Sequence, residues 1–135
     1  MAVAAGINCL KGADRAVVDS LYFASTTFPY REKESATIIT TALDLSPNIR
    51  TADMANSLKA GTGAILYACD SVKSKGAGNI LVCSADYRLA RPGSPQEMVF
   101  GDGAAALLLG SSGVIASLEG PGPWFMEKQS QCSDQ

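Results

Sequence analysis

The sequence has 135 residues, of which 47% are apolar, and its 11 basic and 13 acidic residues give a formal net charge of −2. This length fits one domain that can bury a core, and the apolar content excludes a disordered chain. The sequence has no long basic run, so we expect no nucleic acid partner. Its apolar runs are too short to cross a bilayer, so we expect no membrane association.

The spacing of apolar residues predicts helices and strands that alternate along most of the chain. In chain order, we expect a helix over 2–10, a buried strand over 17–25, a helix over 34–45, a weaker strand over 49–56, a helix over 58–74, a buried strand over 79–86, a loop over 87–97, and a hairpin of strands over 104–110 and 114–118. This alternation predicts an α/β fold whose sheet is mostly parallel, with helices on both faces and the hairpin as an antiparallel edge. The pattern stops near residue 120, which predicts an irregular tail over 120–135.

The sequence contains no histidine, which removes the usual general base near neutral pH. Any Ser-His or Cys-His catalytic unit within this chain is therefore excluded. The four cysteines, Cys9, Cys69, Cys83 and Cys132, are spaced for neither a zinc site nor a disulfide framework. We therefore expect reduced thiols, a cytoplasmic protein and no bound metal.

The two glycines of Gly61-Thr62-Gly63 follow a predicted strand and lie within the predicted helix over 58–74, which invites comparison with a dinucleotide-binding loop. That loop needs a third glycine or alanine where this chain has Leu66, and an acidic residue about 20 positions further on. Both are missing, so the glycines are expected to allow close helix packing, and we predict no cofactor.

Three motifs together resemble the thiolase superfamily, and within it the 3-hydroxy-3-methylglutaryl-CoA synthase branch. They are Asp53 followed by Lys59-Ala60-Gly61-Thr62, Phe100-Gly101-Asp102-Gly103-Ala104-Ala105, and Phe28-Pro29-Tyr30. The first resembles the nucleophile elbow of that branch, in which an Ala-Asp strand leads to Cys and then to Lys-Ala-Gly-Thr. The resemblance covers about residues 2–119 and implies an acyl-CoA ligand and Claisen-type acyl transfer.

The chain departs from this family at the nucleophile. Counting forward from Asp53 and back from Lys59 places the family's cysteine at Leu58, whose side chain cannot attack a thioester. Ser57 is one residue out of register, has no histidine to activate it, and is expected to cap the following helix. Lys59 could contact a CoA phosphate, but lysine is mostly solvated, which favours an exposed helix residue.

The chain also departs from the family at the acidic residue. Aligning Pro29-Tyr30 with the corresponding synthase loop places the family's catalytic glutamate at Thr26. Glu32 and Glu34 are nearby and are expected at the start of a helix, where the helix dipole favours negative charge. We therefore assign no catalytic residue to this chain.

The resemblance implies that residues 1–119 form part of an N-terminal thiolase-like domain whose first strand would lie before Met1. With the strand order 3-2-1-4-5 taken for that family, this strand would be central. The strands over 17–25 and 79–86 would then lack a shared neighbour and expose unpaired backbone groups. Truncation is the favoured explanation, beside re-pairing of the sheet and completion by another chain.

These observations leave three interpretations of function. The first is a catalytically silent, synthase-like domain that acts as a structural or partner subunit. Family dimers pair through the strand before the elbow, here about residues 50–56, so it would form a homo- or hetero-oligomer with another thiolase-fold chain. The second is an acyl-CoA condensing acyltransferase whose remaining catalytic groups lie in a missing half. The third is an unrelated small-ligand α/β domain, which would have its pocket away from the elbow.

Overall fold

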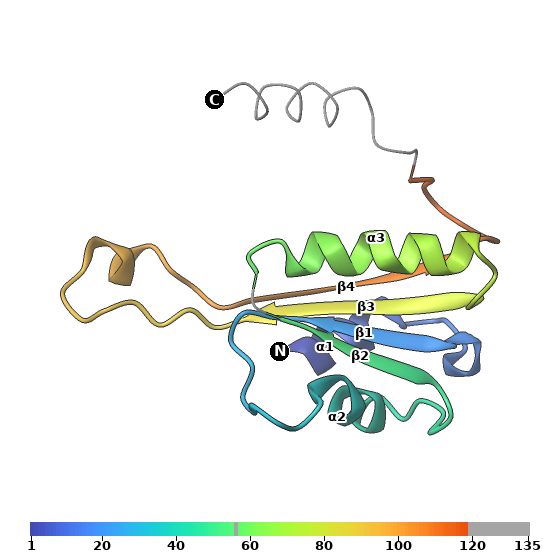
Figure 1. Ribbon diagram of the computed structural model, residues 1–135, viewed down its shortest axis with the longest axis horizontal. Coiled ribbons are helices and arrows are strands. Elements are labelled where there is room, and N and C mark those ends of the chain that lie inside the picture. Colours follow the sequence, from blue (N-terminus) through green and yellow to red (C-terminus); the bar gives the residue numbers. More distant parts are fainter. Residues whose placement is uncertain (56, 119–135) are drawn as a thin grey trace.

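The computed structural model describes residues 1–55 and 57–118 of the chain. In chain order, its elements are α1 (Ala2–Cys9), the short helix η1 (Arg15–Val17), β1 (Ser20–Ala24), α2 (Ser35–Ala42), β2 (Arg50–Met54), α3 (Ala60–Lys73), β3 (Asn79–Asp86), the short helix η2 (Pro95–Met98) and β4 (Gly103–Gly110). Figure 1 shows α3 on one face of the sheet and α1 and α2 on the other. This arrangement confirms the predicted α/β class with helices on both faces. The tail predicted over 120–135 lies outside the described residues.

The sheet has four strands in the order β2-β1-β3-β4, and all but β4 run parallel. The expectation that a missing central strand leaves the strands over 17–25 and 79–86 with unpaired backbone groups is wrong, because β1 pairs directly with β3. Their register runs from Ser20 opposite Ile80 to Ala24 opposite Ser84. The backbone groups that a missing central strand would have left unpaired are therefore used between β1 and β3.

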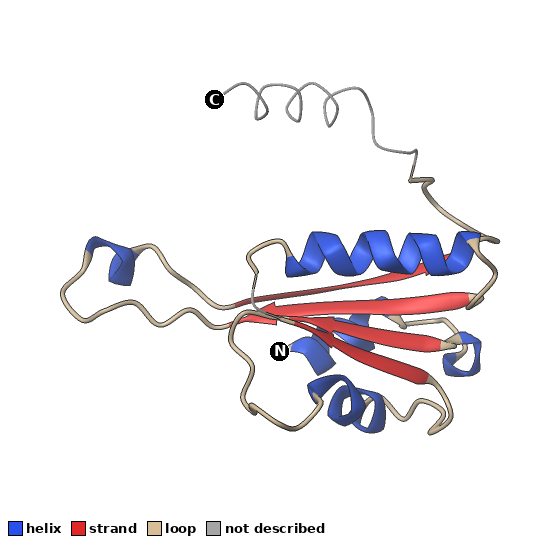
Figure 2. Ribbon diagram, viewed as in Figure 1, coloured by secondary structure: helices blue, strands red, loops and turns tan. Residues whose placement is uncertain are grey.

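The predicted antiparallel edge is present, but its partner is not the expected hairpin strand. All eight residues of β4 pair with β3, and no strand forms over 114–118. The side chain of Ile115 is fully exposed, so this segment buries no apolar face against the sheet. It also forms no hydrogen-bonded ladder with a described strand, and β-branched residues favour a strand only in such a setting. The connection between β3 and β4, residues 87–102, projects from the sheet as an arm that carries η2 (Figure 2).

The core has two parts, one on each face of the sheet. Leu21, Phe23, Leu81 and Cys83 pack toward α1 and α2, whereas Ala24, Ile80 and Val82 pack toward Ala60, Ala64 and Ala68 of α3. Because β1 and β3 are covered on both sides, their sequences are nearly continuous apolar runs instead of alternating ones. The three alanines of α3 are small, which lets this helix lie close to the strands.

The start of α2 is fixed by a carboxylate from β2. Asp53 accepts backbone hydrogen bonds from Ser35 at 2.6 Å and from Ala36 at 2.8 Å. Glu34 occupies the N-cap position, but its carboxylate accepts from the hydroxyls of Thr37 and Thr51 instead of from the helix backbone. Asp53 therefore satisfies the free N–H groups of the first turn and ties α2 to the strand that leads to the elbow.

Replacing Asp53 with alanine is expected to lower the free energy of unfolding by about 1–2 kcal/mol, in the range of a lost helix cap. Urea denaturation followed by circular dichroism measures the change. Asp53→Asn keeps an acceptor oxygen without the charge and should lose less. Equal stability of Asp53→Ala and the unmodified chain would show that the cap contributes nothing.

Candidate functional site

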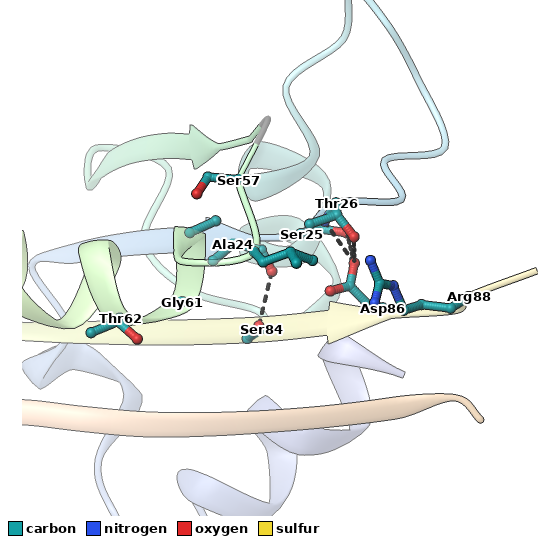
Figure 3. Close-up of a pocket in the computed structure, with 11 residues that line it drawn as sticks. Ala24, Ser25, Thr26, Ser57, Gly61, Thr62, Ser84, Asp86 and Arg88 are labelled. Atoms are coloured by element: carbon teal, nitrogen blue, oxygen red, sulfur yellow. Dashed lines mark hydrogen bonds between the residues drawn. The ribbon is translucent and has the colours of Figure 1, made fainter. Parts of the chain in front are cut away.

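A polar cavity of about 210 Å³ lies where β1 and β3 end and α3 begins. It is lined by Ala24, Ser25, Thr26, Ser57, Leu58, Ala60, Gly61, Thr62, Ser84, Asp86 and Arg88. The carboxyl ends of parallel strands are where open α/β sheets commonly hold ligands, because backbone amides and loop side chains converge there. Figure 3 shows side chains from three separate segments around this space.

The turn before α3 places Leu58 at the cavity. Its assignment to the family's nucleophile position stays a prediction from the motif spacing. The Leu58 side chain is 78% exposed, so it is not held there by core packing. The residue precedes the first turn of α3, where the positive end of a helix would lower a thiol pKa if a cysteine stood there. A leucine side chain cannot itself act as a nucleophile.

Ser57 does not cap α3 as expected. That helix begins at Ala60 with Lys59 at its N-cap position. The Ser57 hydroxyl accepts from the backbone N–H of Lys59 at 3.0 Å, and its carbonyl accepts from Ala60 at 3.0 Å. Ser57 thus stabilises the turn that precedes the helix, while Lys59 is exposed, in keeping with the solvated residue favoured from the sequence.

Thr26, which the motif alignment assigns to the family's acid position, also lines the cavity, and it hydrogen-bonds to a carboxylate on the neighbouring strand. One oxygen of Asp86, Oδ1, accepts from the backbone N–H of Thr26 at 2.6 Å and from its hydroxyl at 3.1 Å. The same oxygen accepts from the hydroxyl of Ser25 and from both the N–H and the hydroxyl of Thr27, at 2.9–3.1 Å. Asp86 therefore fixes the segment that follows β1 to the end of β3 (Figure 3).

These hydrogen bonds set the charge state of Asp86. Partial burial alone would raise the carboxyl pKa, but the bonds from Thr26, Ser25 and Thr27 outweigh that effect and hold the pKa below its ordinary value of 3.8. Hydrogen bonds to the charged form favour that form. Asp86 is thus an anion at neutral pH and is poorly suited to donate a proton.

Arg88 is the cationic residue in the lining and stands beside Asp86 at the base of the arm. Its guanidinium carbon lies 5.3 Å from the centre of the Phe100 ring, a cation–π contact between the beginning and the end of the arm. Together with the backbone at the start of α3, it gives the cavity positive groups that could hold an anionic or carbonyl-bearing ligand.

Sequence reasoning brought Leu58 and Thr26 to this site but missed Asp86 and Arg88. Asp86 is the last residue of a predicted buried strand. An acidic residue at the carboxyl end of such a strand was the sequence signal that could have identified it as a site residue. Glu32 and Glu34 do not line the cavity.

Cys9, Cys69 and Cys83 are free thiols, and none of them lines the cavity. Burial, and then the neighbouring Cys9, raise the pKa of the Cys83 thiol to about 12, so it stays protonated and unreactive. Within the described residues, no group of three His, Cys, Asp or Glu side chains could hold a metal ion, and no helix is long and apolar enough to cross a membrane.

Comparison with known proteins identifies relatives of this chain by sequence. No protein-family profile matches it. The hydroxymethylglutaryl-CoA synthase of Thermococcus gammatolerans is 36% identical over 117 residues, which are 84% of this chain and 33% of that protein. The synthase of Methanocaldococcus jannaschii is 35% identical over 122 residues, 89% of this chain and 35% of that protein. The chain thus spans about one third of the length of these relatives.

Solved structures of synthases have the same fold as this chain. MvaS in complex with 3-hydroxy-3-methylglutaryl coenzyme A superposes with a TM-score of 0.76 at 22% identity, over 81% of this chain and 27% of that one. A 3-oxoacyl-(acyl-carrier-protein) synthase III superposes with a TM-score of 0.76 at 23% identity, over 89% of this chain and 37% of that one. This chain therefore has a thiolase fold and is similar, over most of its length, to one third of a hydroxymethylglutaryl-CoA synthase.

Proposed function

We propose that this chain is a catalytically silent, hydroxymethylglutaryl-CoA synthase-like domain that serves in the cytoplasm as a structural or partner subunit of an acyl-CoA condensing system. The observation that supports the proposal is a cavity lined by Leu58 and Thr26, the two residues that the motif spacing assigns to the family's nucleophile and acid positions. Histidine is absent from the whole sequence. Acyl capture needs a thiolate or alkoxide and a base, and these positions supply neither.

An acyl-CoA is the ligand that we propose for the cavity. Neighbouring structures include synthases bound to 3-hydroxy-3-methylglutaryl coenzyme A and to CoA. The start of α3 and Arg88 offer donors to a thioester carbonyl or a phosphate. Binding without turnover fits a partner subunit, because a ligand can stabilise a fold without reacting.

The partner that we propose is another thiolase-fold chain, either a second copy or a competent enzyme, joined through about residues 50–56. The outer edge of β2, Arg50–Met54, forms one end of the described sheet and pairs there with no other described strand. An open strand edge can extend the sheet into a neighbouring chain through backbone hydrogen bonds.

The second candidate is an acyl-CoA condensing acyltransferase whose remaining groups lie outside this chain. The chain spans only about one third of its relatives, which favours this alternative. It requires a nucleophile other than Leu58, and that requirement separates the two candidates.

Intact-mass spectrometry after incubation with acetyl-CoA and with acetoacetyl-CoA tests the proposal. We expect no adduct on the unmodified chain and one acyl group on Leu58→Cys, because the elbow places that thiol at the start of α3. The matched control is Leu66→Cys, which puts an exposed thiol on α3 away from the cavity and should remain unmodified.

Two outcomes would contradict the proposal. An adduct on the unmodified chain would show that it is not silent, and peptide mapping would then identify the acylated residue. Equal acylation of Leu58→Cys and Leu66→Cys would show that the elbow gives no activation. Circular dichroism must first show that each variant has the same helix content as the unmodified chain.

A further inference from the structure

Another polar cavity, of about 360 Å³, lies at the end of the sheet opposite to the elbow. It is formed where β1 and β2 begin and where the chain turns from α3 into β3, at residues 75–78 (Figure 1). Two cations, Arg50 and Lys75, line it together with the carboxylate of Asp19 and with Ser20. It shares no lining residue with the cavity at the elbow. The two cavities are therefore separate, and the proposed function does not use this one.

Ser20 brings a buried hydroxyl without a hydrogen-bond partner to this cavity. The residue is fully buried, and its Oγ has no partner among the described residues. Its side chain lies on the α3 face of β1, because Tyr22 and Ala24, two and four positions further on, belong to the core on that face. Buried polar groups in proteins nearly always have a partner. A polar molecule in the cavity would supply the partner that the Ser20 hydroxyl lacks.

The two cations of the cavity are not neutralised by ion pairs. Within the described residues, the one ion pair joins Arg15 to Asp44, so it involves neither Arg50 nor Lys75. Nη1 of Arg50 lies 4.0 Å from the place that a Cβ on Gly76 would take, so the guanidinium extends from β2 to the turn after α3. A guanidinium presents its N–H groups as a fork that matches the oxygens of a carboxylate or a phosphate.

Asp19 does not cancel this positive charge. Its Oδ2 accepts hydrogen bonds from the backbone N–H groups of Gly78 at 2.9 Å and Asn79 at 2.8 Å. A Cβ on Gly78 would stand 2.7 Å from the same oxygen, so the absence of a side chain there permits this contact. The carboxylate is thus held at the start of β3 by two amides. One anion faces two cations in the lining, which leaves a formal charge of +2 − 1 = +1.

Lys75 has a backbone conformation that seldom carries a lysine. Its φ is 57°, in the left-handed region, where glycine or asparagine usually ends a helix. The N–H groups of Lys75 and Gly76 donate to the carbonyls of Val72 and Ser71, so the last carbonyls of α3 are occupied and repel an anion less. A lysine at this position has a conformational cost that glycine would avoid, which points to a use for its ammonium group.

We propose that this cavity binds a phosphate group, held by Arg50, Lys75 and the Ser20 hydroxyl. These donors come from β2, from the turn after α3 and from β1, so they converge from three directions. The three acceptor oxygens of a phosphate can meet such a set, whereas the two oxygens of a carboxylate lie in one plane. Strand pairing through β2 would use its backbone groups and leave the Arg50 side chain above the sheet.

NMR titration of the ¹⁵N-labelled chain with inorganic phosphate at constant ionic strength tests the site. We expect saturable shifts of the amide signals of Gly76 and Gly78, which line the cavity, and none at Gly61 at the elbow. A second titration with glycerol phosphate separates the two sources of the group. Tighter binding of this monoester assigns an organic phosphate, and tighter binding of the free ion assigns inorganic phosphate. Acetate should bind more weakly than either.

Variants of the cationic residues test the contacts. Arg50→Gln and Lys75→Gln should each raise the Kd for phosphate at least about tenfold, as expected for the loss of a charge-assisted hydrogen bond. The matched control is Lys73→Gln, which removes the same charge from an exposed position on the last turn of α3 outside the cavity. Its Kd should change less than about twofold, because a solvated charge at a distance is screened by salt.

Ser20→Ala tests whether the buried hydroxyl serves a ligand or the fold. Without phosphate, this variant should be at least as stable as the unmodified chain in urea, because it removes a buried polar group that has no partner. Its Kd for phosphate should rise at least about threefold. Reduced stability together with an unchanged Kd would give the hydroxyl a structural role and overturn its place in the site.

Three further results would overturn the proposal. One is the absence of a saturable shift at Gly76 and Gly78 with either phosphate compound. Another is an equal Kd for Arg50→Gln and Lys73→Gln, which would mean that phosphate responds only to the net charge of the chain. The last is a larger shift at Gly61, which would place the anion at the start of α3. None of these results bears on acylation at the elbow, so this inference and the proposed function stand or fall separately.

Discussion

Replacing Asp86 with alanine is expected to lower the free energy of unfolding by about 2–3 kcal/mol. Oδ1 of this carboxylate receives five hydrogen bonds from Ser25, Thr26 and Thr27. Hydrogen bonds to charged groups are among the stronger ones in proteins, and their loss leaves partly buried donors without a partner. Urea denaturation followed by circular dichroism measures the change. The cavity should also lose its shape, since its Thr26 wall is held by this residue.

The same carboxylate predicts how stability depends on pH. The folded pKa of Asp86 lies below its ordinary value of 3.8, so the folded state favours the charged form. The resulting stabilisation is fully present above the unfolded pKa and is lost as the pH falls through the folded pKa. Stability of the unmodified chain should therefore decline as the pH is lowered from about 5 toward 2, and Asp86→Ala should show a shallower decline.

Asp86→Asn separates the charge from the acceptor. The amide oxygen can still accept hydrogen bonds, so this variant should lose less stability than Asp86→Ala at neutral pH while showing the same shallow pH dependence. An unchanged pH profile in both variants would mean that Asp86 does not contribute to acid sensitivity. Full stability of Asp86→Ala would show that the five hydrogen bonds are replaced by water without cost.

Two leucines of the chain should respond to truncation in opposite ways. Leu81 is fully buried in the central strand β3, and Leu81→Ala should cost about 2–5 kcal/mol, the range measured for leucine removal from well-packed cores. Leu58 is 78% exposed, and Leu58→Ala should change stability by less than about 0.5 kcal/mol. Parallel urea denaturation of both variants makes the comparison.

Comparing the stability losses of Leu58→Ala and Leu81→Ala tells whether the fold requires the packing of the Leu58 side chain. A small effect of Leu58→Ala means that the fold does not require this side chain and that a cysteine could stand there, as the acylation experiment assumes. A loss as large as that of Leu81→Ala would mean that Leu58 is packed in solution and that the elbow differs from the structure.

Local sequence patterns predicted most of the elements. The strand over 79–86 was predicted with its observed bounds, because a run of apolar residues lies between two glycines and a proline-containing loop. The helix over 58–74 was predicted two residues too early at its start, since Ser57 caps a turn and not the helix itself. The strand predicted over 114–118 failed because β-branched residues favour a strand only where a partner is available.

The order of the strands lay beyond those patterns. Backbone hydrogen bonds are the same for every strand, so a sequence that specifies β1 and β3 does not say whether they are neighbours. The strand order taken from the family resemblance put a missing strand between them, whereas the structure pairs them directly. That pairing also decides which edges are open.

The sequence by itself determined the α/β class and the absence of histidine, because these follow from periodicity and composition. The assignment of Leu58 to the nucleophile position stays a prediction from the family resemblance. The tertiary structure alone decided that Asp86 binds Thr26, which lies 60 residues earlier in the chain. It also placed both residues and Leu58 around one cavity. Contacts between residues so far apart depend on how the strands pair, and the spacing of residues along the chain does not encode that pairing.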